Sequence, residues 1–327
     1  MPWLLLTRLA ALIATALVVG FAAGSALVHA HPAYPALLAV TLLLSLVALL
    51  RAVRRGRRAS PGASGAGPAT EGAARGPSLR RRTGRVLAAV GVVVWLGVLA
   101  WLRPLGAVQP ALEAMTSGPG VEVVETATWI ELRPSGEGVP TALLFQPGAK
   151  VDARAYAAVL RPLAASGVLV VVPKQPLGIA FLAVSAFERA RAAHPEVESW
   201  VVGGHSLGGT VAAMDADAHD EDGTAPVVGL LLYASYPASD LSASLDAAVL
   251  SISGSRDGLS TPAEIDDSRA LLPPAAELVE IEGASHASFG DYGQQSGDGV
   301  PTLPADEARA RIAELTTGFV ASLVDLP

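Results

Sequence analysis

The 327-residue chain predicts an α/β domain built on an eight-stranded, mostly parallel sheet and preceded by three membrane-spanning helices. Three observations support this organisation. Apolar runs without an internal charge fill the first third, short β-branched runs alternate with Ala-rich amphipathic segments after residue 103, and the net charge changes sign between these parts. The mean hydropathy of +0.44, with 51% apolar residues, is high for an ordinary soluble protein.

The first part, residues 1–102, is expected to be a membrane anchor. Its apolar runs cover residues 9–28, 35–50 and 86–102, and a helix crosses a bilayer with about 20 apolar residues, about 17 being the lower limit. The first run could instead be a cleaved signal peptide, because residues 28–30 resemble a small-x-small cleavage site. Its apolar core is longer than the usual stretch of about 7 to 15 residues, which favours an uncleaved helix.

Charge predicts the orientation of this anchor. Residues 1–102 contain eleven Arg against one acidic residue, a net charge of +10, and ten of these Arg lie in the loop 51–85. The positive-inside rule makes this loop cytoplasmic, so the chain is expected to be a multi-pass cell-membrane protein with its C-terminal domain on the extracytoplasmic side. The Arg cluster is compatible with contact to acidic lipids, and a separate nucleic-acid role is the less favoured interpretation.

The second part begins with a Pro- and Gly-containing linker, residues 103–120, followed by the α/β domain, residues 121–327. Residues 103–327 carry 12 Lys and Arg against 29 Asp and Glu, a net charge of −17. An acidic domain repels a phosphate backbone, which argues against nucleic-acid binding. Cys is absent, which excludes disulfides, thiolate metal ligands and a Cys nucleophile.

The alternation of short β-branched runs with Ala-rich segments places each element of the domain. Strands are expected at residues 121–125, 128–132, 142–146, 168–172, 200–203, 227–233, 248–253 and 278–282. Helices are expected at residues 152–165, 179–193, 207–216, 262–271 and 304–323. Residues 169–172 and 227–232 are apolar without alternation, which is typical of parallel strands covered by helices on both faces.

The fifth expected strand runs directly into a Gly-x-Ser-x-Gly motif that precedes a helix. Such a turn strains the serine backbone and requires tiny residues two positions before and after it, a requirement that Gly204 and Gly208 meet. Ser206 is therefore the candidate nucleophile, and the backbone N–H of Leu207 is the candidate donor to an oxyanion. The side chain of His205 is expected to point away from Ser206 and to pack in the protein interior. A Gly-rich turn without chemistry is the alternative.

A serine hydroxyl needs a base, and the base needs a carboxylate that fixes its tautomer. In the chain order Ser, acid, His, the base is His286, the only His after residue 219. Asp257, in the turn after the seventh expected strand, is the candidate acid, and Asp240 is its rival. The second oxyanion donor is expected to be the backbone N–H of Ala149, although a plain turn would also fit there.

With this triad in place, residues 120–325 resemble the α/β-hydrolase superfamily, and within it the small dienelactone-hydrolase-like enzymes. The resemblance rests on the elbow together with residues 147–152, 236–237, 240–242 and 289–293. It implies an α/β-hydrolase fold and ester-type hydrolysis without a cofactor. Dienelactone hydrolases themselves use Cys where this chain has Ser206, so the resemblance does not support dienelactone as the substrate.

The connection 233–246 leaves no room for a helical cap, so we expect a shallow, open site. The loop 289–299 could line that site or could be an ordered surface loop. The acidic cluster 215–223 lacks the Gly that an EF-hand requires at its sixth position, and the chain has no His-Glu-x-x-His pair. We therefore interpret the cluster as a solvated helix end and expect neither a metal nor a cofactor.

The leading hypothesis is a membrane-anchored serine hydrolase that cleaves carboxylic esters or related acyl bonds through an acyl-enzyme. Its expected partners are a small or solvent-exposed ester and the lipid bilayer, and no oligomeric state is predicted. One alternative is a non-catalytic, membrane-anchored interaction module on the same fold. Another keeps the triad and cleaves an amide, peptide or thioester, since the triad chemistry is shared.

Overall fold

The computed structural model describes residues 24–58, 79–136 and 140–324 and divides the chain into two compact units. The first unit comprises Met1–Gly24 and Pro35–Arg103, and the second comprises Ser25–Tyr34 and Pro104–Pro327. The short segment Ser25–Tyr34 therefore packs with the C-terminal domain, although it lies far from that domain in the sequence.

The first unit contains two long helices, α3 (Ala33–Arg58) and α4 (Leu79–Trp101). In α3, Ala33–Arg51 is 19 residues long with a mean hydropathy of 2.3, and it is the one helix among the described residues that is long and apolar enough to cross a membrane. Two of the expected spans fall within the described residues: the one at 35–50 lies in this helix, and the one at 86–102 is corrected to a shorter apolar segment. In α4, Arg residues occupy the first two turns and leave Val86–Trp101, which is shorter than the roughly 20 residues a bilayer requires.

Other parts of the expected anchor lie outside the described residues. They are residues 9–23 of the first expected span and residues 59–78 of the Arg-rich loop. The end of the first span falls within α2 (Gly24–His29), a short helix at the start of the described chain.

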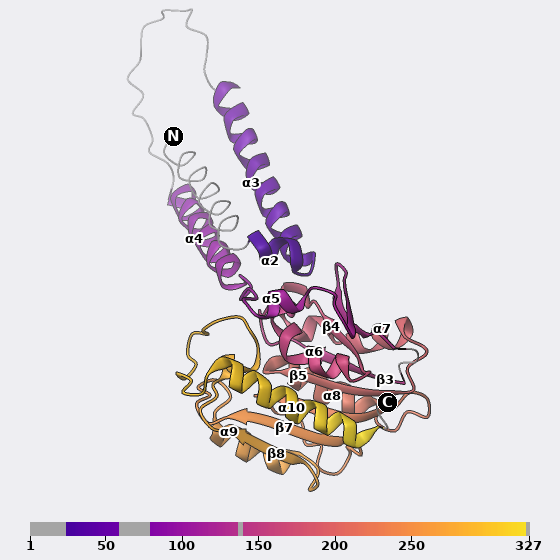
Figure 1. The fold of residues 1–327 in the computed structure, drawn as a ribbon. Coiled ribbons are helices and arrows are strands. Elements are labelled where there is room, and N and C mark those ends of the chain that lie inside the picture. The colour runs from indigo at the N-terminus through magenta and orange to yellow at the C-terminus, as the bar shows by residue number, and fades with distance from the viewer. Residues whose placement is uncertain (1–23, 59–78, 137–139, 325–327) are drawn as a thin grey trace, which may run out of the picture. The chain divides into compact units, whose positions relative to one another are not determined.

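The second unit is built on an eight-stranded sheet, as the sequence predicts (Figure 1). Its strand order is β1-β2-β4-β3-β5-β6-β7-β8; β1 pairs with β2 and β2 with β4 in antiparallel fashion, and the remaining pairs are parallel. The strands are β1 (Val121–Glu125), β2 (Trp129–Pro134), β3 (Thr141–Gln146), β4 (Leu169–Pro173), β5 (Ser199–His205), β6 (Val227–Tyr233), β7 (Ala248–Gly254) and β8 (Glu277–Ile281).

Helices cover both faces of this sheet and make two separate cores. The helices are α5 (Ala111–Ala114), α6 (Ala157–Ala165), α7 (Ala186–Ala193), α8 (Leu207–His219), α9 (Pro262–Ser268) and α10 (Ala305–Leu323), with 3₁₀ turns η1 (Ala153–Tyr156), η2 (Pro176–Gly178), η3 (Ala180–Ala183), η4 (Arg269–Leu271) and η5 (His286–Phe289). Side chains alternate across β3, so Leu143 packs with α6 and α10 while Leu144 packs with α7 and α8. All six residues of β3 are buried, as a central parallel strand requires.

Two local expectations differ from the structure. The helix expected at 179–193 is interrupted, because Ser185 leaves helical geometry between η3 and α7. The segment expected to be a linker packs along the domain: the N–H of Leu105 donates to the Lys150 carbonyl at 2.7 Å, and that of Val108 donates to the Asp291 carbonyl at 2.8 Å. These partners are distant in sequence, so local composition does not reveal them.

Candidate active site

The loops that follow β3, β5, β7 and β8 leave the sheet at the same edge, because these four strands run parallel. Ala149 follows β3, Ser206 follows β5, Asp257 follows β7, and His286 follows β8. The topology therefore gathers all the predicted site residues at the carboxyl edge of the sheet, where open α/β sheets bind their ligands.

Ser206 occupies a strained turn between β5 and α8. Its φ of 52° and ψ of −126° lie in a region that non-Gly residues rarely adopt. A Cβ added to Gly204 would lie 2.4 Å from the Gly208 carbonyl carbon, and one added to Gly208 would lie 2.2 Å from the Gln146 carbonyl oxygen. Both glycines are thus required sterically, as the sequence predicts. The contact of Gly208 also brings the start of α8 close to the backbone of Gln146 and Pro147, at the end of β3.

His286 is held by Asp257 through a buried hydrogen bond of 2.8 Å between Nδ1 and Oδ2. The other carboxylate oxygen of Asp257 accepts the backbone N–H groups of Leu259 and Ser260, each at 2.8 Å. Because a carboxylate only accepts, Nδ1 carries the proton and Nε2 is left as the basic nitrogen. Nε2 is buried and has no hydrogen-bond partner within the described part of the chain.

The rival acid, Asp240, is not brought to the base. Its Oδ1 accepts the N–H of Ser242 at 3.0 Å and the hydroxyl of the same residue at 2.6 Å, so it stabilises its own exposed turn. Of the two carboxylates that the sequence leaves open, the structure therefore pairs Asp257 with His286.

The ring of His286 lies beside the elbow. Its centroid is 4.5 Å from that of His205, the residue immediately before Ser206. The described residues form no hydrogen bond between the Ser206 hydroxyl and His286 Nε2; in ligand-free sites such bonds are often long and tighten when substrate binds.

The two expected oxyanion donors both have backbone N–H groups without a partner. Neither Leu207, the first residue of α8, nor Ala149 donates to another group in the described ranges, and both residues are partly exposed. The close contact of Gly208 with Gln146 places their two segments backbone to backbone. These two N–H groups, on adjoining segments beside the elbow, are therefore available to a ligand, as an oxyanion hole would require.

Comparison with models of known protein families assigns the chain to a family. The profile described as "Alpha/beta hydrolase family" matches residues 142–310, slightly more than half of the chain, and this range includes the elbow, Asp257 and His286. The chain belongs to the alpha/beta hydrolase family. No curated protein matches the whole sequence significantly.

Many solved structures resemble this alpha/beta hydrolase in fold. Esterase 2 of Thermogutta terrifontis, phosphorylated by paraoxon, is 19% identical with a TM-score of 0.45, and the match covers 64% of this chain and 96% of that one. A candidate dienelactone hydrolase of Klebsiella pneumoniae is 16% identical with a TM-score of 0.48, covering 62% and 98% of the two chains. A predicted CIB-like hydrolase of Thermoplasma acidophilum is 15% identical with a TM-score of 0.47, covering 62% and 98%.

A buried polar chain supports the elbow of this hydrolase domain from inside. The N–H of Gly148 donates to the hydroxyl of Tyr156 at 2.9 Å, and that hydroxyl lies 2.9 Å from His205 Nδ1. Burial, together with the charge of nearby His286, holds the pKa of His205 well below its usual value, so the His205 ring beside the phenol is neutral. His205 packs inside, as predicted, and Tyr156 is a supporting residue that the sequence pattern did not reveal.

A cavity of about 320 Å³ lies beside the segment that carries His286. It is lined by residues of the loop 289–299 and by Ser285, Ala287 and Ser288, which flank His286. The residues that line this cavity do not include Ser206, His286 or the expected oxyanion donors, so whether the loop lines the catalytic site stays a prediction.

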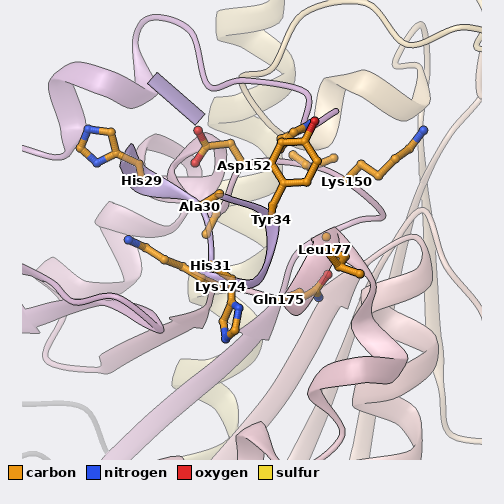
Figure 2. A pocket seen from close by; sticks show the side chains of 13 residues that line it. His29, Ala30, His31, Tyr34, Lys150, Asp152, Lys174, Gln175 and Leu177 are labelled. Atoms are coloured by element: carbon orange, nitrogen blue, oxygen red, sulfur yellow. The ribbon is translucent and has the colours of Figure 1, made fainter. Parts of the chain in front are cut away.

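A second, small cavity is lined by residues of the segment Ser25–Tyr34 and of the loops after β3 and β4 (Figure 2). Lys174 and His29 both bond Glu125 there, at 2.7 and 2.9 Å, and Tyr34 is almost fully buried. Its free volume of about 30 Å³ is enough for water and too small for a substrate. This is the place where the segment Ser25–Tyr34 packs on the domain.

No group of three or more potential metal-ligating side chains occurs in the described ranges. The acidic cluster at the end of α8 is mixed in character: Asp217 is exposed, as a solvated helix end predicts, while Asp215 is buried with one oxygen unpaired. Burial raises the pKa of Asp215 to about 7.

Proposed function

We propose that the chain is a serine hydrolase that cleaves carboxylic esters through an acyl-enzyme. The observation that carries the proposal is the buried pairing of His286 with Asp257 beside a nucleophile elbow whose serine has a strained backbone. Membership of the alpha/beta hydrolase family supports hydrolysis as the reaction class.

In the proposed mechanism the hydroxyl oxygen of Ser206 attacks the ester carbonyl carbon while its proton moves to His286 Nε2. Asp257 holds the ring in the required tautomer and stabilises the imidazolium that forms. The N–H groups of Leu207 and Ala149 stabilise the negative charge on the carbonyl oxygen. His286 then protonates the leaving alkoxide, which departs as an alcohol.

The second half of the reaction reverses these roles. A water molecule attacks the acyl-enzyme while His286 Nε2 accepts its proton, and the second tetrahedral intermediate collapses to release the carboxylic acid and the Ser206 hydroxyl. Residues 234–247, between β6 and β7, contain no helix, so no cap covers the nucleophile from this connection. An uncapped site favours small esters or an ester exposed on a larger molecule.

We further propose that the domain is tethered to a membrane and faces the extracytoplasmic side. Helix α3 supports the tether through its length and hydropathy, and the Arg-rich sequence between residues 51 and 85 supports its orientation. With that sequence on the cytoplasmic side, the proposal also requires the shorter apolar segment Val86–Trp101 to cross the membrane, and a bilayer accommodates a short helix by thinning locally. Protease added to intact cells should then remove the domain. A domain that is protected in intact cells and cleaved only after lysis would contradict this orientation.

The catalytic proposal is tested by ester hydrolysis with the full chain in detergent micelles, using p-nitrophenyl esters of increasing acyl length. Ser206→Ala should lower kcat by on the order of 10³-fold or more. Ser244→Ala, an exposed serine in the same domain, is the matched control and should retain wild-type activity. Equal activity of the Ser206→Ala and wild-type proteins would refute the proposed nucleophile, and preferential cleavage of the matching anilides or thioesters would reassign the acyl bond.

A further inference from the structure

Asp298 lies in the loop that follows η5. Its carboxylate accepts hydrogen bonds from backbone N–H groups of the loops after β7 and β8. Its Oδ1 accepts from His286 at 3.0 Å and from Gly258 at 3.2 Å, and its Oδ2 accepts from Ala287 at 2.8 Å. Gly299 donates to Oδ1 at 2.7 Å. One carboxylate thus bridges the turn that carries the candidate acid and the first residues of the loop that carries the candidate base.

The segment that contains Asp298 packs closely against the turn that contains Asp257, and glycines occupy the points of contact. A Cβ on Gly258 would lie 2.7 Å from the Gly297 carbonyl oxygen, and a Cβ on Gly299 would lie 1.8 Å from that of Arg256. The segment 297–299 therefore lies directly on the acid turn, and Asp298 has little freedom to reach other partners. Among the described residues it forms no ion pair, so its charge is satisfied by these backbone donors.

The electrostatics agree with this arrangement. Burial alone would raise the pKa of Asp298, but the N–H groups of Ala287 and Gly258, the Ser285 side chain and the N–H of His286 together outweigh it and lower that pKa. The carboxylate is therefore ionised at neutral pH, and charge-assisted bonds are stronger and more directional than neutral ones.

We propose that Asp298 is a positioning residue for catalysis, which fixes the backbone of His286 relative to the Asp257 turn so that the imidazole is aligned with both Asp257 and Ser206. The Asp257 side chain orients the ring, whereas Asp298 orients the main chain from which the ring projects. This inference deepens the proposed function and rests on it, because it assumes that His286 is the base.

The role goes beyond holding the loop folded. The turn η5 keeps its own capping interactions, with Ser285 N–H donating to the hydroxyl of Ser288 at 3.0 Å, and the N–H of Thr302 still donates to the Gly283 carbonyl at 2.9 Å. Loss of Asp298 should therefore leave the loop in place but free to shift. A misplacement of about 1 Å can lower a reaction rate by about 10²-fold.

The test uses the full chain in detergent and compares Asp298→Ala and Asp298→Asn with the wild type. Asp298→Ala should lower kcat by about 10- to 100-fold with KM within about twofold. Asp298→Asn should be intermediate, because its amide oxygen still accepts from Gly258 and His286 while its NH₂ group cannot accept from Ala287. Asp291→Asn, which changes a carboxylate of the same loop bonded to Arg309, is the matched control and should keep the wild-type kcat.

A double-mutant cycle separates positioning from general destabilisation. We would measure the rate of fluorophosphonate labelling per folded molecule in wild-type and His286→Ala backgrounds, each with and without Asp298→Ala. Because Asp298 is proposed to act through His286, Asp298→Ala should slow labelling in the first background and have no further effect in the second. An equal slowing in both, or none in the wild-type background, would overturn the inference alone. A wild-type chain that is folded and unlabelled would instead overturn the proposed function and this inference with it.

Discussion

Gly208 is the residue at which a single methyl group should disable the proposed oxyanion hole while leaving the proposed triad intact. A Cβ at this position would lie 2.2 Å from the Gln146 carbonyl oxygen and 2.4 Å from that of Pro147. Real Cβ contacts are essentially never shorter than 3.0 Å. In Gly208→Ala, the start of α8 and the loop after β3 must therefore separate by ~0.8 Å at the closest point.

This separation moves Ala149 away from Leu207, the two residues whose N–H groups are proposed to hold the oxyanion. Losing one such donor lowers kcat by about 10²- to 10³-fold, and we expect about 10²-fold for a shifted donor. Overpacking should also lower the free energy of unfolding by about 1 to 3 kcal/mol. Gly208 has ordinary helical geometry, so the effect is steric and does not come from the backbone angle of the new Ala.

The assay is steady-state ester hydrolysis by the full chain, with a thermal unfolding curve for each variant. Gly318→Ala is the matched control, because Gly318 lies in the exposed face of α10 with no atom near its missing Cβ. That variant should keep the wild-type kcat and gain up to about 1 kcal/mol from helix propensity. Wild-type kcat in Gly208→Ala would refute the reasoning, since it would mean that the contact between α8 and the loop after β3 does not set the geometry of the reaction.

Three further predictions concern the acid, a buried carboxylate and a buried ion pair. Asp257→Asn should lower kcat by roughly 10⁴-fold because an amide no longer selects the productive tautomer, and more than a tenth of the wild-type kcat would contradict this. Burial raises the pKa of Asp215 from its ordinary value of 3.8 to about 7, so the unfolded chain loses this proton first and the free energy of unfolding should fall as pH rises between these values. Urea unfolding at several pH values should show that Asp215→Asn removes this slope and that Asp217→Asn, on the exposed side of the same helix, keeps it; an unchanged slope in the first variant would count against the burial of that carboxylate. Glu125→Ala should lower the free energy of unfolding by about 2 kcal/mol, because the Lys174 side chain is 4% exposed and loses its carboxylate, although Glu125 is 25% exposed and Lys174 keeps its bond to the Thr126 carbonyl. A loss below about 1 kcal/mol in chemical unfolding would show that the pair is effectively solvated.

The sheet could be predicted from the sequence because its signals are local. Apolar runs such as β6 can be buried on both faces only in a parallel sheet with helices on either side, and the expected β1 and β6 coincide with the observed strands. The elbow could be predicted because the glycines around Ser206 are a steric requirement within seven residues of chain.

The rest depends on contacts between distant segments. Tyr156 lies in an ordinary amphipathic stretch, and only the fold brings its hydroxyl to Gly148 and His205. Asp298 is one acidic residue in a polar loop, and nothing local marks the four N–H groups that meet it. The choice between Asp257 and Asp240 likewise needed the geometry, because both follow strands at the same edge.

In the expected membrane anchor, a local pattern led to a prediction that the structure does not support. That prediction is the membrane span at residues 86–102. The run at residues 86–102 is apolar and flanked by Arg, but the first turns of α4 contain Arg80, Arg81 and Arg82. The remaining apolar segment, Val86–Trp101, is shorter than the roughly 20 residues that match the thickness of a bilayer.

The central claim is that Ser206 is a nucleophile activated by His286. The most direct measurement is to treat the full chain with a fluorophosphonate and locate the modified residue by peptide mass spectrometry, since labelling requires an activated serine and no knowledge of the substrate. We expect one adduct, on Ser206, which is lost in Ser206→Ala and strongly reduced in His286→Ala. A folded protein that stays unlabelled, or an adduct on a different serine, would contradict it.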